Sequence, residues 1–146
     1  MTREQMATVL AHALEGYPFE VCGVFVGPAN GRRVQRVVRV PNREQESPRV
    51  RYEIAPEDLL RIQKDARTNG DEILGFYHSH PDHPARPSET DRRVAAEGLS
   101  DGVVHLVVGV EGGARATPAA WVFRDALAGF EPEPLEIDAK EDEPWR

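Results

Sequence analysis

The chain has 146 residues, of which 40% are hydrophobic and 29% are charged, and a chain of this length forms one domain with its own hydrophobic core. This composition excludes a wholly disordered protein, and no apolar run approaches a membrane span, so we expect a cytoplasmic protein without a membrane partner. Cys22 is the single cysteine, which excludes an internal disulfide and a thiolate zinc cluster.

The formal net charge of −7 is distributed unevenly along the chain. Seven acidic and two basic residues fall between positions 131 and 146, so the remainder is nearly neutral, which argues against nucleic acid as a partner. We expect residues 1–137 to form the domain and residues 138–146 an acidic disordered tail. One basic stretch is either a solvated edge strand and loop or a docking surface for an acidic protein partner. Its members are Arg32, Arg33, Arg36, Arg39, Arg43, Arg49 and Arg51.

Apolar periodicity and capping or turn residues predict the secondary structure. Thr2 and Gln5 form a capping-box pattern, Pro56 suits the first turn of a helix, and Pro132 and Pro134 place the last strand at an edge. In chain order we expect helix 2–15, strands 21–26, 33–40 and 50–54, helix 56–68, strand 72–77, helix 88–98, and strands 103–110, 119–123 and 130–137. This order favours an α/β fold with a single mixed β-sheet flanked by helices.

The most distinctive stretch runs from His78 to Asp91 and reads H-S-H-P-D-H-P-A-R-P-S-E-T-D. His78 and His80 stand two residues apart on an extended segment, so their side chains point to the same side and can bind one metal ion. Asp91 adds a carboxylate. Two imidazoles and a carboxylate, without a thiolate, suit one zinc ion with an open fourth position, which is typical of a catalytic site.

Ser88 and Asp91 also have a purely structural interpretation. The pattern S-x-x-D ahead of an apolar-periodic stretch is an N-terminal helix signature, and a helix that begins at Ser88 would hold Asp91 at a fixed distance from the histidines. A catalytic zinc site further needs a carboxylate base, which the residue pattern alone does not select. Of the other candidates, we expect His83 at the rim and Cys22 packed as a small hydrophobe.

Together with Y-P-F-E-V-C-G at residues 17–23, the H-S-H-P-x6-S-x-x-D motif resembles the JAMM (MPN+) zinc metalloprotease family, and in particular its prokaryotic stand-alone members of the Mec type. The resemblance covers nearly the whole chain. It implies the JAMM/MPN fold, a cytidine-deaminase-like α/β/α arrangement. It also implies that His78, His80 and Asp91 are the zinc ligands, that Glu20 is the catalytic glutamate, and that Ser88 stabilises the oxyanion.

The resemblance implies a zinc metallopeptidase or isopeptidase that hydrolyses the amide bond after the C-terminal Gly-Gly of a ubiquitin-like or ThiS/MoaD-like sulfur-carrier protein. Cysteine is one candidate leaving group, and a homodimer is a further expectation because relatives often pair. The alternative is a catalytically silent MPN-type interaction module, but such relatives lack metal ligands or the glutamate, whereas this chain retains all five residues. A DNA-repair role like that of RadC fits the near-neutral domain and acidic tail poorly.

Overall fold

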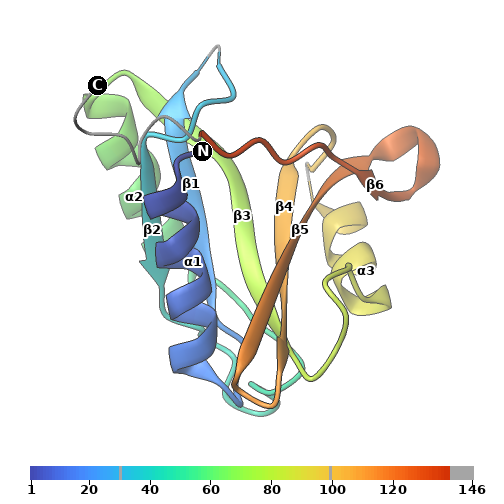
Figure 1. The fold of residues 1–146 in the computed structure, drawn as a ribbon. Helices are drawn as coiled ribbons and strands as arrows, with labels where there is room; N and C mark the ends of the chain where they lie inside the picture. The colour runs from blue at the N-terminus through green and yellow to red at the C-terminus, as the bar shows by residue number, and fades with distance from the viewer. Residues whose placement is uncertain (30, 99, 139–146) are drawn as a thin grey trace.

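A computed structural model describes residues 1–29, 31–98 and 100–138, which fold around a six-stranded sheet of order β2-β1-β3-β4-β5-β6 (Figure 1). The two central strands, β3 and β4, are parallel, and the other neighbouring pairs are antiparallel. The elements are α1 (Arg3–Gly16), β1 (Cys22–Pro28), β2 (Arg36–Val40), α2 (Pro56–Thr68), β3 (Asp71–Pro81), α3 (Glu89–Glu97), β4 (Val104–Glu111), β5 (Arg115–Arg124), a 3-10 turn η1 (Asp125–Leu127) and β6 (Gly129–Pro132). The predicted single mixed sheet flanked by helices is confirmed.

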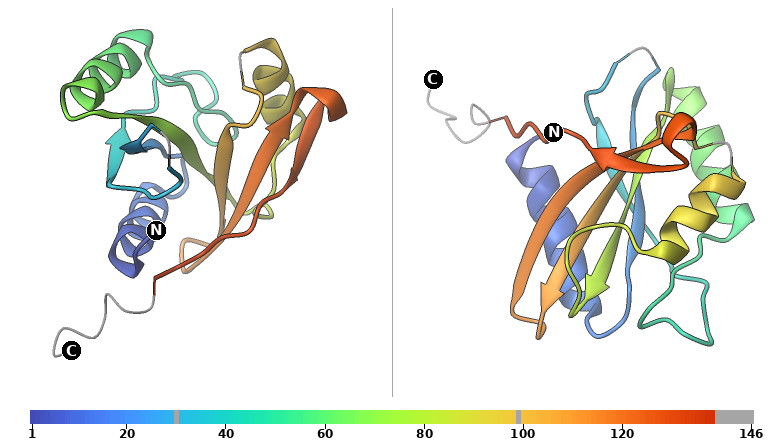
Figure 2. Two further views of the ribbon diagram at one scale, coloured as in Figure 1. Left: turned by 90° about the horizontal axis from the view of Figure 1, so that it is seen from above. Right: turned by 90° about the vertical axis from the view of Figure 1, so that its right-hand side faces the viewer.

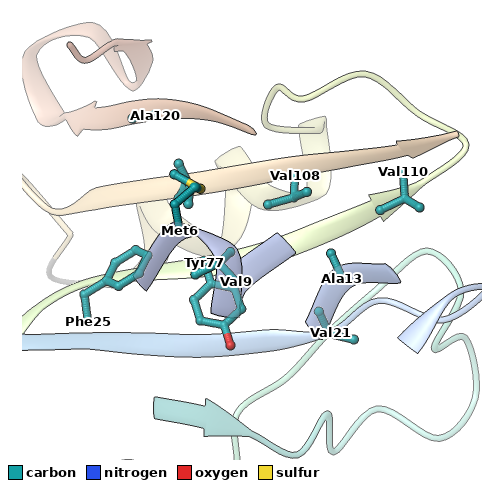
Figure 3. Packing of buried hydrophobic residues seen from close by; sticks show 10 residues of the cluster. Met6, Val9, Ala13, Val21, Phe25, Tyr77, Val108, Val110 and Ala120 are labelled. Carbon is teal, nitrogen blue, oxygen red and sulfur yellow. The ribbon is translucent and has the colours of Figure 1, made fainter. Parts of the chain in front are cut away.

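Helix α1 covers one face of the sheet. Thr2 caps it through the predicted capping box, in which the Gln5 amide N–H donates to the Thr2 hydroxyl at 3.0 Å. Because apolar residues recur at helical spacing, α1 presents one buried stripe to the sheet. This stripe packs against every second side chain of the strands, since successive side chains of a strand point to opposite faces. This cluster is shown in Figure 3 and contains Met6, Val9, Ala13, Val21, Phe25, Tyr77, Leu106, Val108, Val110 and Ala120.

Helices α2 and α3 lie on the opposite face (Figure 2). Ile62 and Ala66 of α2 pack against alternate residues of β1. All residues of β1 except Pro28 at its end are buried, because helices cover both faces of this part of the sheet. Helix α3 connects the parallel strands β3 and β4 and contacts β6. On this side of the sheet a cavity lies between the connection that precedes α2 and the N-terminus of α3.

The predicted strand at 50–54 is wrong. Residues 51–55 have no regular secondary structure, and the side-chain amide of Asn42 bonds the backbone on both sides of Tyr52 where a partner strand would be needed. The alternation that suggested a strand has another cause, since Tyr52 and Ile54 pack on the β1 cluster from an irregular segment. Two strands are longer than predicted: β3 continues to Pro81, and β5 begins at Arg115.

The C-terminal segment returns to the N-terminus. Asp138 forms an isolated bridge with Thr2 and an ion pair with Arg33, while residues 139–146 of the expected acidic tail lie outside the described residues. Within the described part of the chain, no helix is long and apolar enough to cross a membrane.

Candidate metal centre and catalytic site

Strand β3 delivers both histidines. His78 and His80 lie within the strand itself; both pair with β4, and His78 also pairs with Cys22 of β1, so hydrogen-bonded neighbours hold this backbone. Alternation along the strand directs Tyr77 into the α1 cluster and both imidazoles toward the opposite face. The two Nε2 atoms are 3.1 Å apart, so the side chains point to the same side, as the spacing in the sequence predicts, and both are buried.

The N-terminus of α3 delivers Asp91. Ser88 is the N-cap, and its hydroxyl accepts from the Asp91 amide at 3.0 Å while Oδ2 of Asp91 accepts from the Ser88 amide at 2.9 Å. The same Oδ2 lies 3.0 Å from Nε2 of His78 and 3.1 Å from Nε2 of His80. The capping interpretation and the site interpretation therefore describe one geometry, because the capping box holds the carboxylate against the histidines.

Glu20 precedes β1 and is buried, with only 6% of its surface exposed. Ligand-type atoms of Glu20, His78 and His80 all lie within 4.8 Å of one another. Burial raises the pKa of Glu20 to about 8; His80 acts against this rise and Asp91 adds to it. A carboxylate that is poorly solvated in this way is a stronger base than one in water.

Burial alone would raise the pKa of Asp91, but hydrogen bonds with His78 and His80 lower it well below its ordinary value. Burial lowers the pKa of His78, which favours the neutral imidazole that a metal requires. The site therefore contains a carboxylate that remains ionised and a second, Glu20, that readily holds a proton.

Two contacts that hold the imidazoles were not predicted. Nδ1 of His80 lies 3.1 Å from the carbonyl oxygen of Pro84, while its Nε2 faces His78 and Asp91. Tyr52 stacks on His78, with ring centroids 4.5 Å apart and planes 22° from parallel, while Nδ1 of His78 has no hydrogen-bond partner among the described residues. Tyr52 lies in the segment 51–55, which has no regular secondary structure, so no periodic pattern in the sequence indicates this contact.

A cavity of about 510 Å³ opens onto this cluster and is lined in part by Glu20, His80 and Ser88. The bond from the Asp91 amide uses the Ser88 oxygen as an acceptor, so the hydroxyl proton is still available to a ligand in the cavity. His83 is exposed at the rim, as expected. Cys22 is fully buried and its thiol lies 3.5 Å from the carbonyl of Val40, which confirms packing.

A mixed sheet between helices, with two strand histidines and the capping-box aspartate of α3 beside a buried glutamate, defines an α/β/α protein with a candidate metal site. Residues 2–124 match the family described as prokaryotic homologs of the JAB domain, and the chain belongs to this family. Among its relatives, the desampylase of Haloferax volcanii is 40% identical over 131 residues, which is 85% of this chain and 90% of that protein. The CysO-cysteine peptidase of Mycobacterium tuberculosis is 36% identical over 61% of this chain and 60% of its own length.

Solved structures agree with this assignment. A protein from Desulfitobacterium hafniense has a TM-score of 0.79 at 32% identity and covers 94% of this chain, with 90% of its own chain matched. A JAB1/MPN domain protein from Archaeoglobus fulgidus has a TM-score of 0.58 at 18% identity, with 94% of each chain covered, and supports the fold alone. The expected JAMM/MPN fold and family are confirmed.

Proposed function

We propose that this protein is a zinc-dependent metallopeptidase that hydrolyses the amide or isopeptide bond after the C-terminal Gly-Gly of a ubiquitin-like or sulfur-carrier protein. The observation that carries the proposal is the convergence of two imidazole nitrogens and one carboxylate oxygen beside the buried Glu20. The relatives named as a desampylase and a CysO-cysteine peptidase support this substrate class.

His78, His80 and Asp91 would hold the metal. Their three donor atoms are separated by 3.0–3.1 Å, close to the spacing of about 3.3 Å that tetrahedral ligation at zinc distances requires. Nitrogen and oxygen donors without a thiolate suit a single zinc ion with an open position. When bound there, zinc would supply a Lewis acid that polarises the scissile carbonyl.

Glu20 and Ser88 would carry the proton transfer and the charge stabilisation. Glu20 accepts a proton from the attacking water and returns it to the leaving amine, for which its raised pKa of about 8 is suited. Ser88 lies at the cavity and donates its hydroxyl proton to the oxyanion that develops on the carbonyl, a contribution of about 3 kcal/mol for one such donor.

The test is intact-mass analysis of a Gly-Gly-tailed sulfur carrier, amide-linked to cysteine, after incubation with the zinc-loaded protein. A chelated sample and the Glu20→Ala variant run alongside. We expect loss of the cysteine mass alone, and no loss in either control.

If the conjugate stays intact although the protein has bound zinc, this substrate is rejected, and a carrier linked through lysine to a second protein is tried next. An intact conjugate together with failure to bind zinc would favour the catalytically silent interaction module.

A further inference from the structure

Asn42 lies in the connection between β2 and α2 and uses both ends of its side-chain amide. Nδ2 donates to the carbonyl oxygens of Glu20 at 3.1 Å and Arg51 at 3.0 Å, while Oδ1 accepts the amide protons of Glu44 and Glu53, each at 3.0 Å. These four bonds use both protons and both lone pairs of the amide. A side chain bonded in this way has one orientation and fixes the backbone around it.

One of these bonds holds the backbone of Glu20. Glu20 precedes β1, so no strand ladder fixes it; its N–H donates to the carbonyl of Pro48 at 2.7 Å, and its carbonyl accepts from Asn42. Both backbone groups of Glu20 are therefore held by residues 42–48. The position of its carboxylate beside the histidines depends on this connection as well as on the sheet.

The other bonds fix the backbone around Tyr52. Asn42 bonds the carbonyl before Tyr52 and the amide after it, and Tyr52 stacks on His78. The side chain of Asn42 thus joins the segment that holds Glu20 to the segment that supports His78. The backbone of Glu20 and the backbone around Tyr52 therefore cannot shift relative to one another without loss of a hydrogen bond to Asn42.

We propose that Asn42 is a positioning residue that fixes the Glu20 carboxylate relative to the metal-site histidines. It touches no reacting atom and acts through Glu20, whose backbone it ties to the segment around Tyr52. The inference rests on the proposed function for its kinetic consequence, and on the hydrogen bonds alone for its structural one. A displacement of about 1 Å in a catalytic group can cost about 100-fold in rate.

Asn42→Asp tests this directly, because a carboxylate keeps the acceptor for Glu44 and Glu53 and loses the donors to Glu20 and Arg51. The control is Asn69→Asp, which makes the same charge change at the end of α2, where the side chain donates once, to Asp65 at 3.3 Å. Each variant is examined as full-length zinc-loaded protein by steady-state kinetics and by hydrogen exchange of the peptide that contains Glu20.

We expect Asn42→Asp to lower kcat at least tenfold with KM changed by less than about twofold, and to leave the zinc content unaltered. In a Glu20→Gln background the same change should have little further effect on kcat, because Asn42 acts through Glu20. Amide exchange around Glu20 should accelerate in Asn42→Asp and remain unchanged in Asn69→Asp.

Unchanged kcat, or an equal loss of kcat with and without Glu20, would overturn the proposal. If the wild-type protein hydrolyses no conjugate, the proposed function fails, and the exchange result still decides whether Asn42 holds Glu20. Should Asn42→Asp fail to fold, Asn42→Ser removes most of the amide bonds without adding a charge, and unchanged exchange around Glu20 in that variant would also overturn the proposal.

Discussion

Glu20 combines burial with a titratable carboxylate, so in the metal-free protein it should destabilise the fold as the pH rises. The folded state raises its pKa from 4.5 to about 8, and therefore retains a proton that the unfolded chain releases between these values. The stability associated with this proton is present below pH 4.5 and is lost as the pH rises through 8.

We therefore predict that Glu20→Gln stabilises the chelated protein in a pH-dependent way. Near pH 4.5, the pKa of Glu20 in the unfolded chain, the variant and the wild type should have the same free energy of unfolding. At neutral pH the free energy of unfolding of the variant should be higher by about 3 kcal/mol. Urea unfolding in the presence of a chelator, at acidic and at neutral pH, measures the difference. A difference of the same size at both pH values would show that proton release by Glu20 is not its cause.

Ser88 caps α3, and we propose that it also stabilises the oxyanion; different substitutions should separate these two roles. Ser88→Gly retains a residue that is tolerated at an N-cap, so stability should fall by only a few tenths of a kcal/mol, whereas kcat should fall about 100-fold because the oxyanion donor is lost. Ser88→Ala should lose a similar factor in kcat and about 1 kcal/mol of stability as well. Equal kcat in Ser88→Gly and wild type would remove Ser88 from the catalytic mechanism.

The residues of the site were predictable to different degrees. His78, His80 and Asp91 are close in the sequence, and a period of two on a strand and a capping pattern on a helix are enough to bring them together. Glu20 lies far from them in the sequence, just before β1, and only the family resemblance selected it from among the carboxylates. Tyr52 and Asn42 act through a connection without regular structure, and such contacts have no periodic signal.

At the scale of elements, the helices were predicted well because their ends carry local chemical signals. Thr2, Pro56 and Ser88 mark the starts of α1, α2 and α3. Strand ends depend on partners that are distant in the sequence. β3 extends to Pro81 because β4 continues to pair with it. In the segment 50–54, by contrast, the backbone of Arg51 and Glu53 bonds the side chain of Asn42 and the amide of Arg43, and no regular strand forms.

The loop after β3 lies directly on β4, and this contact supplies a prediction. A Cβ atom at Gly109 would lie 2.8 Å from the carbonyl oxygen of His83 and 3.1 Å from the amide of Ala85. These are backbone atoms, so Gly109→Ala must displace the loop whose Pro84 carbonyl orients His80.

We expect Gly109→Ala to weaken zinc binding about tenfold, as loss of an outer contact to a ligand typically does. Gly31→Ala is the control, because a Cβ there has its nearest neighbour at 3.9 Å. Competition with a chromogenic chelator measures the affinity. Unaltered affinity in Gly109→Ala would mean that the loop does not orient His80.

At the scale of the molecule, ion pairs divide the basic stretch into two parts. Arg32, Arg33, Arg36 and Arg39 pair with acidic residues of this chain, for example Arg36 with Asp65 at 2.9 Å and Arg39 with Glu15 at 2.7 Å. Arg43, Arg49 and Arg51 form no ion pair with any described residue, and all three belong to the connection that borders the cavity. We therefore expect a docking surface for an acidic partner at residues 43–51, where the arginines have no acidic partner among the described residues.

This division predicts how charge reversal affects binding of a carrier conjugate with an acidic surface. Arg43→Glu combined with Arg49→Glu should raise KM about tenfold at low ionic strength and much less at high salt, since exposed charges are screened. Arg36→Glu combined with Arg39→Glu changes the net charge equally, but it alters arginines that already have partners, so KM should stay within about twofold. Steady-state kinetics at two salt concentrations compare the pairs. Equal effects of both pairs would indicate that only overall charge matters, and no effect of either would exclude arginine-mediated docking at the mouth of the site.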